Sequence, residues 1–258
     1  VTQLARHSLM QPHAPALRFL GRTTTWAELH HRVRGLAAAL HRRGIGSGDR
    51  VMILMLNRPE FVETCLAATM LGAIAVPVNF RLTPAELAYL VEDCGAGVLV
   101  TEPMLAPVAA AVRALAPGLT TVIVAEAESD VSAGVLGYEE LLGEDGDPAP
   151  PVDVPNDSPA LIMYTSGTTG HPKGAVLTHT NLAAQTMTAI YTTGPDINND
   201  VAFIGVPLFH IAGVGNTLPG LTLGIPTVIY PLGAFDPAAL LDVLSAEKVS
   251  GIFLVPAQ

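Results

Sequence analysis

Short, continuously apolar runs alternate along the chain with segments in which apolar residues recur at helical spacing. Such runs are typical of strands that are buried on both faces of a parallel sheet, where strict alternation with polar residues is not needed. Alternation of these strands with helices predicts an α/β fold, in which largely parallel sheets are covered by helices. In the first half we expect strands at 51–55, 73–78, 98–101 and 121–125, and helices at 59–71, 83–94 and 104–115.

Capping signals support two of the helix starts. Thr25-Trp26-Ala27-Glu28 and Thr83-Pro84-Ala85-Glu86 each place Thr three residues before Glu, which is the capping-box pattern. The first predicts a helix from about residue 25 to 43, and the second begins the helix at 83–94. Upstream, residues 16–20 and 22–25 predict a hairpin about Gly21.

The pattern changes after residue 125. Residues 126–160 contain ten acidic residues, no Lys or Arg and five prolines, which favours a linker or a surface excursion with one short helix near 138–142. A solvated acidic surface is a better interpretation of these acids than a cation site. Strands are then expected at 161–165, 175–178, 201–206, 227–230 and 251–255, and helices at 181–191, 210–222 and from 236 onward.

These segments predict three parts. Residues 1–125 form a first α/β subdomain, residues 126–160 an acidic, Pro-rich linker or excursion, and residues 161–258 a second α/β subdomain. Because the last expected strand is followed by only three residues, we expect the second subdomain to be incomplete at its C-terminal end.

Composition and charge narrow the functional classes. Half of the residues are hydrophobic and 14% are charged, which favours a globular core. The net charge is −10, and residues 114–258 contain only two lysines against fifteen acidic residues. No basic stripe that could bind nucleic acid is therefore predicted. The stretch Val201–Phe235 has no charged residue, but four prolines and several glycines divide it, which favours sheet core over a membrane span. We expect a cytoplasmic protein; peripheral membrane contact and homo-oligomerisation stay open.

The segment Tyr164–Gly174, with sequence YTSGTTGHPKG, carries the clearest chemical signal. Glycines let backbone N–H groups converge, hydroxyls add donors, and Lys173 adds a compact positive charge, a combination suited to a polyphosphate. Lys173 is one of only two lysines in the chain. The alternative is an ordinary Gly- and Thr-rich surface loop.

Other motifs fit this segment less well. A P-loop needs Ser or Thr directly after its Gly-Lys, whereas Pro172 precedes Lys173 and Gly174 follows it. A nucleophile elbow around Ser166 needs glycine at 164 and 168, where Tyr164 and Thr168 stand. Neither a Walker A site nor a covalent serine is predicted.

Residues 164–174 closely resemble the phosphate-binding signature of the adenylate-forming superfamily, which includes acyl-CoA synthetases, nonribosomal peptide adenylation domains and firefly-type luciferases. Pro207–Gly213, with sequence PLFHIAG, resembles the next motif of that superfamily. Pro77–Leu82, with sequence PVNFRL, is similar to a pattern frequent in its bacterial fatty-acyl-CoA ligase branch. The layout of the chain is compatible with the N-terminal part of such an enzyme.

The resemblance implies a two-step reaction with ATP, Mg²⁺ and coenzyme A. A carboxylic acid, expected to be a fatty acid, attacks the α-phosphorus of ATP, and a thiol then takes the acyl group from the adenylate. The resemblance assigns Lys173 and His210 to catalysis, and Thr165 also becomes a candidate Mg²⁺ contact. The implied phosphate contacts are Thr165, Ser166, Gly167, Thr168, Thr169, Gly170 and Lys173.

His210 matches the position that orients the substrate carboxylate and gates thioester formation. The alternative for His210 is a histidine satisfied inside an apolar core. The later superfamily signatures, for adenine, ribose and a C-terminal lysine, do not occur in the 258 residues. The sequence therefore leaves two hypotheses: the N-terminal part of an acyl-CoA ligase that is inactive by itself, or a non-catalytic module for nucleotide binding or interaction.

Overall fold

Two sheets organise the chain in the computed structural model, which describes residues 2–130, 134–144, 148–150, 152–165 and 170–254. The chain divides into two compact units. One comprises Val1–His31, Leu56–Pro59 and Asn181–Gln258, and the other comprises Arg32–Met55 and Glu60–Thr180. We call these the first and the second unit.

A seven-stranded sheet forms the centre of the second unit, in the order β7-β6-β5-β3-β4-β8-β9. All neighbouring pairs are parallel except β8 and β9, which are antiparallel. The strands are β3 (Arg50–Leu54), β4 (Ile74–Pro77), β5 (Val98–Thr101), β6 (Thr121–Val124), β7 (Val135–Gly137), β8 (Pro159–Thr165) and β9 (Lys173–Thr178). β4 and β5 are buried at every position, as expected for strands covered on both faces.

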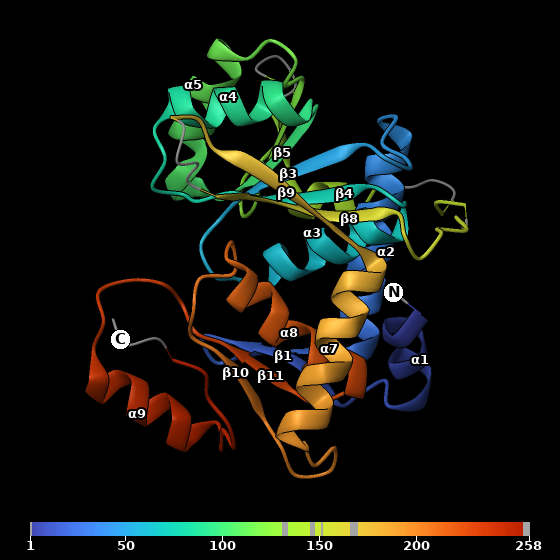
Figure 1. The fold of residues 1–258 in the computed structure, drawn as a ribbon, viewed down its shortest axis with the longest axis vertical. Helices are drawn as coiled ribbons and strands as arrows, with labels where there is room; N and C mark the ends of the chain where they lie inside the picture. The colour runs from blue at the N-terminus through green and yellow to red at the C-terminus, as the bar shows by residue number, and fades with distance from the viewer. Residues whose placement is uncertain (1, 131–133, 145–147, 151, 166–169, 255–258) are drawn as a thin grey trace. The chain divides into compact units, whose positions relative to one another are not determined.

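Helices cover both faces of this sheet. The helices are α3 (Pro59–Met70), α4 (Pro84–Cys94), the short 3₁₀ helix η1 (Pro103–Leu105), α5 (Ala106–Leu115) and α6 (Tyr138–Leu142). Helices α4 and α5 lie on one face and α3 lies on the other (Figure 1). Right-handed crossovers require this, because the chain moves in one direction from β3 to β4 and in the opposite direction from β4 to β5 and β6.

The first unit contains a four-stranded sheet in the order β10-β11-β1-β2. Its strands are β1 (Pro15–Phe19), β2 (Arg22–Thr25), β10 (Ala202–Ile204) and β11 (Thr227–Ile229), and its helices are α1 (Thr2–Met10), α8 (Ile211–Leu223) and α9 (Pro237–Ala246). The division between the units falls inside helix α2 (Trp26–Arg42), after His31, and near the start of helix α7 (His179–Thr193), after Thr180. β1 pairs with β11 in parallel, so the N-terminal hairpin belongs with the C-terminal third of the chain.

The predicted strands and helices are largely confirmed, including both capping boxes at Thr25 and Thr83. The expected strand at 251–255 is wrong for the described residues, where only Gly251 forms an isolated bridge to Ala202. Helix α1 and strand β7 were not predicted. Parallel pairing across the chain also makes the units discontinuous, whereas the predicted subdomains are consecutive.

The uncharged stretch 201–235 forms β10, α8 and β11. No helix within the described ranges combines the length and the apolar character needed to cross a membrane.

Part of the acidic segment is built into the second unit. Tyr138 opens α6, is fully buried, and donates a hydrogen bond of 2.8 Å to the carboxylate of Glu63. Glu63 also accepts 2.7 Å from Arg32, which forms a second ion pair with Glu139. Burial raises the pKa of Glu63, while the contacts with Arg32 and Tyr138 oppose that shift. Residues 135–142 therefore complete the unit as an edge strand and a packed helix.

Candidate functional site

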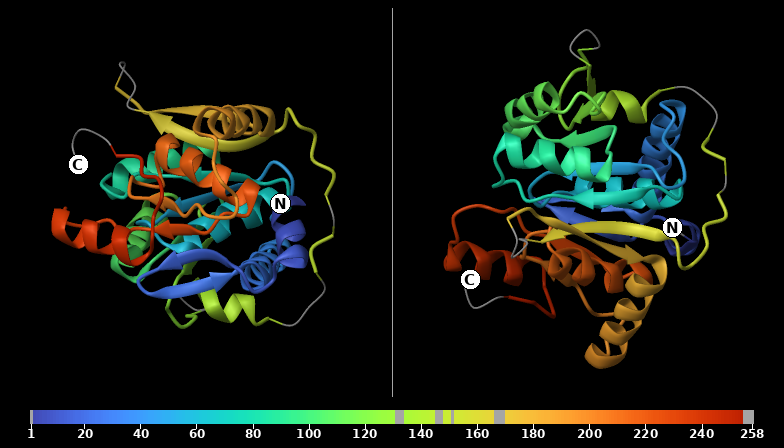
Figure 2. Two further views of the ribbon diagram at one scale, coloured as in Figure 1. Left: turned by 90° about the horizontal axis from the view of Figure 1, so that it is seen from below. Right: turned by 45° about the horizontal axis from the view of Figure 1, so that its top comes forward.

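The hairpin of β8 and β9 presents the two ends of the Gly- and Thr-rich segment. The two strands run side by side in Figure 2 (yellow), and their register places Thr165 opposite Lys173 and Tyr164 opposite Gly174. Thr165 and Lys173 are both exposed. Within the described part of the chain Lys173 has no ion-pair partner, so a hydroxyl and an ammonium group at this end of the hairpin can both meet an anion from solvent.

Residues 170–172 lead back into β9, and we call them the returning arm. Gly170, at its start, has a φ of +104°. That backbone conformation is open to glycine and strained for other residues, so Gly170 sets the direction in which the chain re-enters β9. The predicted contacts Ser166, Gly167, Thr168 and Thr169 lie outside the described residues. Their roles stay predictions from the sequence.

Helix α4 contacts the chain on both sides of this segment. Tyr164 donates a hydrogen bond of 2.5 Å to the carboxylate of Asp93. Burial of the phenol and the hydrogen bond to Asp93 raise the pKa of Tyr164, which keeps it a proton donor. On the returning arm, the His171 ring stacks on Tyr89, with 4.8 Å between ring centroids and 27° between ring planes.

The motif Pro207–Gly213 lies in the first unit, between β10 and α8. His210 is the N-cap residue of α8, with φ −97° and ψ 152°, and its ring lies 4.5 Å from that of Phe209. His210 is exposed and Phe209 is buried. The interpretation of His210 as a satisfied core histidine is therefore wrong, because the N-cap geometry holds its ring at the surface.

The buried side chain of Asn57 holds the backbone of this motif. Its amide nitrogen donates to Val206 O at 2.9 Å and to Tyr230 O at 3.2 Å, and its oxygen accepts 2.8 Å from Leu208 N. Asn57 is only 2% exposed. Three hydrogen bonds from one buried amide fix the start of the motif against the ends of β10 and β11, two residues before His210.

The site residues predicted from the sequence did not include Asn57, Tyr89 or Asp93. The position of Asn57 could have indicated a role. It follows a buried parallel strand, and sites in α/β proteins form at the carboxyl ends of such strands. Tyr89 and Asp93 are separated by four residues on a predicted helix, so they share a face. The sequence could not indicate what that face contacts.

The described residues contain no group of three or more His, Cys, Asp or Glu side chains able to hold a metal ion. A Mg²⁺ ion that arrives on a nucleotide needs only one or two protein ligands, since phosphate oxygens and water supply the rest. The exposed Thr165 hydroxyl fits such a contact.

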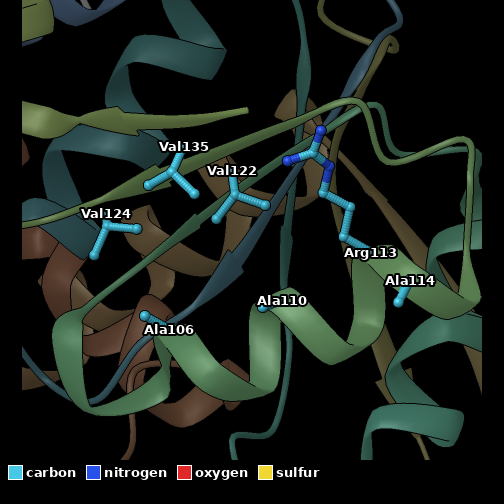
Figure 3. Close-up of a pocket in the computed structure, with 7 residues that line it drawn as sticks. All are labelled: Ala106, Ala110, Arg113, Ala114, Val122, Val124 and Val135. Carbon is cyan, nitrogen blue, oxygen red and sulfur yellow. The ribbon is translucent and has the colours of Figure 1, made fainter. Parts of the chain in front are cut away.

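A surface groove of about 400 Å³ lies elsewhere in the second unit, between α5 and the strands β6 and β7. Figure 3 shows the alanines of α5 across from the valines of the two strands. The groove is lined by Ala106, Ala110, Arg113, Ala114, Val122, Val124 and Val135. β7 and β9 form opposite edges of the sheet, so this groove is distinct from the Gly- and Thr-rich segment, and no predicted site residue lines it.

Comparison with known proteins adds a family. A family model described as AMP-binding enzyme matches residues 4–258. A feruloyl-CoA synthase from an Amycolatopsis species is 40% identical over 253 residues, which are 97% of this chain and 47% of that protein. An indoleacetate–CoA ligase of Aromatoleum aromaticum is 36% identical over 98% of this chain and 49% of its own length. A long-chain-fatty-acid–CoA ligase of Thermus thermophilus is 34% identical over 90% of this chain and 42% of its own length.

Solved structures agree on the fold. The anthranilate CoA ligase AuaEII, solved in complex with anthranoyl-AMP, superposes with a TM-score of 0.88 and 25% sequence identity. The match covers 96% of this chain and 48% of that one. The chain thus spans about half the length of the curated relatives it matches.

Proposed function

The chain belongs to the AMP-binding enzyme family, and we propose that it supplies the ATP phosphate-binding part of an AMP-forming acid–CoA ligase. In this reaction the oxygen of a carboxylate forms a bond to the α-phosphorus of ATP, and pyrophosphate leaves. The sulfur of coenzyme A then takes the acyl group and releases AMP. ATP with its Mg²⁺, the acid and coenzyme A are all substrates.

The observation that carries the proposal is the pairing of Thr165 with Lys173 across the end of the β8–β9 hairpin. A carboxylate is ionised at neutral pH, so the protein need not activate it as a nucleophile. The main barrier is the approach of one anion to another, and fixed positive charge with hydroxyl donors lowers it. Lys173 neutralises phosphate charge, while Thr165 hydrogen-bonds a phosphate oxygen or contacts its Mg²⁺.

His210 contributes a second function in the first unit. Its exposed imidazole, fixed at the N-cap of α8, can donate a hydrogen bond to the carboxylate oxygen of the acid and so orient it. Because Asn57 holds the motif in place, His210→Ala should leave the fold intact. It should slow adenylate or thioester formation at least about tenfold, within the range of a lost oriented donor. A variant that unfolds would contradict this assignment.

The acid is a carboxylic acid whose class differs among the relatives, which are named for ferulate, indoleacetate and long-chain fatty acids. The fatty acid expected from the Pro77–Leu82 pattern is one candidate, and aryl acids are the other. A panel with both classes in an ATP–pyrophosphate exchange assay distinguishes them.

Lysine substitutions test the proposal directly. A charge-assisted phosphate contact contributes about 1.5–3 kcal/mol, so Lys173→Ala should weaken Mg·ATP binding at least about tenfold in a calorimetric titration of the chain. AMP, with fewer phosphates, should lose less affinity. Lys248→Ala is the matched control, because Lys248 is the only other lysine. Equal ATP affinity for Lys173→Ala and the control would refute the assignment.

The same titrations test the alternative hypothesis of a non-catalytic module. A chain that binds ATP tightly and responds to Lys173→Ala, but supports no exchange with any acid, would be a nucleotide-binding module, the second hypothesis from the sequence.

A further inference from the structure

We propose that helix α4 is the positioning element of the phosphate-binding loop, with Asp93 and Tyr89 each holding one of the two arms that lead into it. The proposal deepens the proposed function, on which its nucleotide readout rests. All the contacts that carry it lie within the second unit.

The first arm is held through Tyr164, one residue before Thr165. Its hydroxyl donates 2.5 Å to Asp93, an O–H···O⁻ hydrogen bond of the short, charge-assisted kind. The opposite side of the Tyr164 ring packs against Gly174, its partner on β9. A Cβ added to Gly174 would lie 3.3 Å from the Tyr164 ring and 2.9 Å from Ile162. The tyrosine ring thus packs on the bare backbone of β9, which directs its hydroxyl toward α4.

The second arm is held through His171, one residue after Gly170. Its ring stacks on Tyr89 with nearly parallel planes, 27° apart. Tyr89 and Asp93 are four residues apart on α4, so they occupy one face of the helix, about one turn apart. One rigid element therefore contacts the chain immediately outside Thr165 and immediately outside Gly170.

Helix α4 is suited to act as a fixed support. Its start is closed by the capping box of Thr83 and Glu86, and its end by Gly95 in the left-handed conformation. Arg50, from β3, donates to the carbonyl oxygens of Cys94 at 2.5 Å and of Gly95 at 2.6 Å, which adds positive charge at the C-terminal end of the helix. Its inner face is anchored in the core by the buried residues Leu87, Ala88, Leu90 and Val91.

The function of this support follows from the ordering cost of binding. A phosphate that contacts Thr165 and Lys173 needs both groups in place at once. Because α4 holds Tyr164 and His171, which are close neighbours of these two residues in the chain, less order has to be created when the ligand arrives. Tyr164, Asp93, Tyr89 and His171 are positioning residues; none of them needs to touch the nucleotide.

Amide hydrogen exchange of the unliganded chain tests the anchoring without any ligand. Asp93→Ala and Tyr164→Phe should each speed exchange at the loop end of the β8–β9 ladder by about threefold or more. Asp93→Asn keeps an acceptor oxygen and should remain close to the parent. Because both variants break the same bond, the double variant should be no faster than either single one. Unchanged exchange in Asp93→Ala, or additive effects, would overturn the proposal.

The second arm has its own matched pair. Tyr89→Phe keeps the stacking surface and should exchange like the parent, whereas Tyr89→Ala should speed exchange after Gly170. Glu92→Ala, on the exposed side of the same helix, controls for general loosening of α4. Equal exchange rates in Tyr89→Ala and Glu92→Ala would overturn the role of this arm.

Nucleotide titrations then separate this inference from the proposed function. Asp93→Ala should raise the Kd for Mg·ATP about threefold to tenfold, with recovery in Asp93→Asn. If the parent chain does not bind ATP, the proposed function fails while the exchange result still decides the anchoring. If the parent binds ATP and Asp93→Ala binds it equally well, the positioning role fails and the proposed function stands.

Discussion

Substitution of Gly213 by alanine is expected to destabilise the first unit. The loss should exceed the stability gained from the higher helix propensity of alanine. Gly213 lies in the first turn of α8, where the helix passes directly over the Pro207–Leu208 backbone. A Cβ at this position would lie 2.2 Å from Pro207 O and 2.6 Å from Leu208 Cα. Both are main-chain atoms, so no side-chain rotation can relieve the overlap.

The magnitude follows from these distances. Restoring ordinary contact requires the helix and the Pro207–Leu208 segment to separate by about 1 Å, and overpacking of this kind costs about 1–3 kcal/mol. Leu208 N is bound to the buried Asn57, which favours the upper end of that range. Alanine regains about 1 kcal/mol of helix propensity. The expected net loss in the free energy of unfolding is therefore about 2 kcal/mol.

Gly215 provides a matched control on the same helix. A Cβ there would lie 3.2 Å from the amide nitrogen of Gln185, the far end of a flexible side chain. Gly215→Ala should thus be neutral or stabilise the protein by up to about 1 kcal/mol. The two substitutions have the same chemistry and differ only in what the new methyl group meets.

Urea unfolding followed by tryptophan fluorescence measures the difference. Trp26 is the only tryptophan, is fully buried, and lies in the same unit as α8. At constant m value, Gly213→Ala should lower the unfolding midpoint by about 1 M relative to the parent. Equal midpoints for Gly213→Ala and Gly215→Ala would refute the close approach of α8 to the motif.

Two further predictions concern the second unit. Glu63→Ala should lower its stability by about 3 kcal/mol, because the fully buried Tyr138 hydroxyl loses its acceptor and Arg32 loses one of its two carboxylates; Glu63→Gln should cost less, and equal losses in thermal unfolding would contradict this. The bidentate contact with Arg43 lowers the pKa of Glu144 to about 2. The stabilisation from this ion pair is complete above pH 4.5, the ordinary pKa of the carboxyl group, and is lost as the pH falls toward 2. Since the pair is partly exposed, Glu144→Gln should cost about 0.5–1 kcal/mol at pH 7 and nothing near pH 2, and a difference independent of pH would contradict the linkage.

Local signals in the sequence predicted most of the helices and strands and the fold class. Continuous apolar runs predicted the strands of the parallel sheet, and the capping pattern at Thr83 predicted where α4 begins. Both signals are short-range, since burial on two faces and satisfaction of the first helical N–H groups depend on a few neighbouring residues. The chemical identity of the loop was equally local, because glycines, hydroxyls and one lysine stand next to one another.

Pairings between distant segments needed the tertiary structure. The sequence could not show that β1 joins β11, because registers between remote strands leave no periodic trace. It left His210 open between a buried and an exposed position, and the N-cap geometry of α8 decided it. It also gave Asp93 and Tyr89 no role, although their place on one face of α4 was readable. What that face contacts depends on packing between Asp93 and Tyr164, which are 71 positions apart in the sequence. Contacts of that range form only when the whole sheet is assembled.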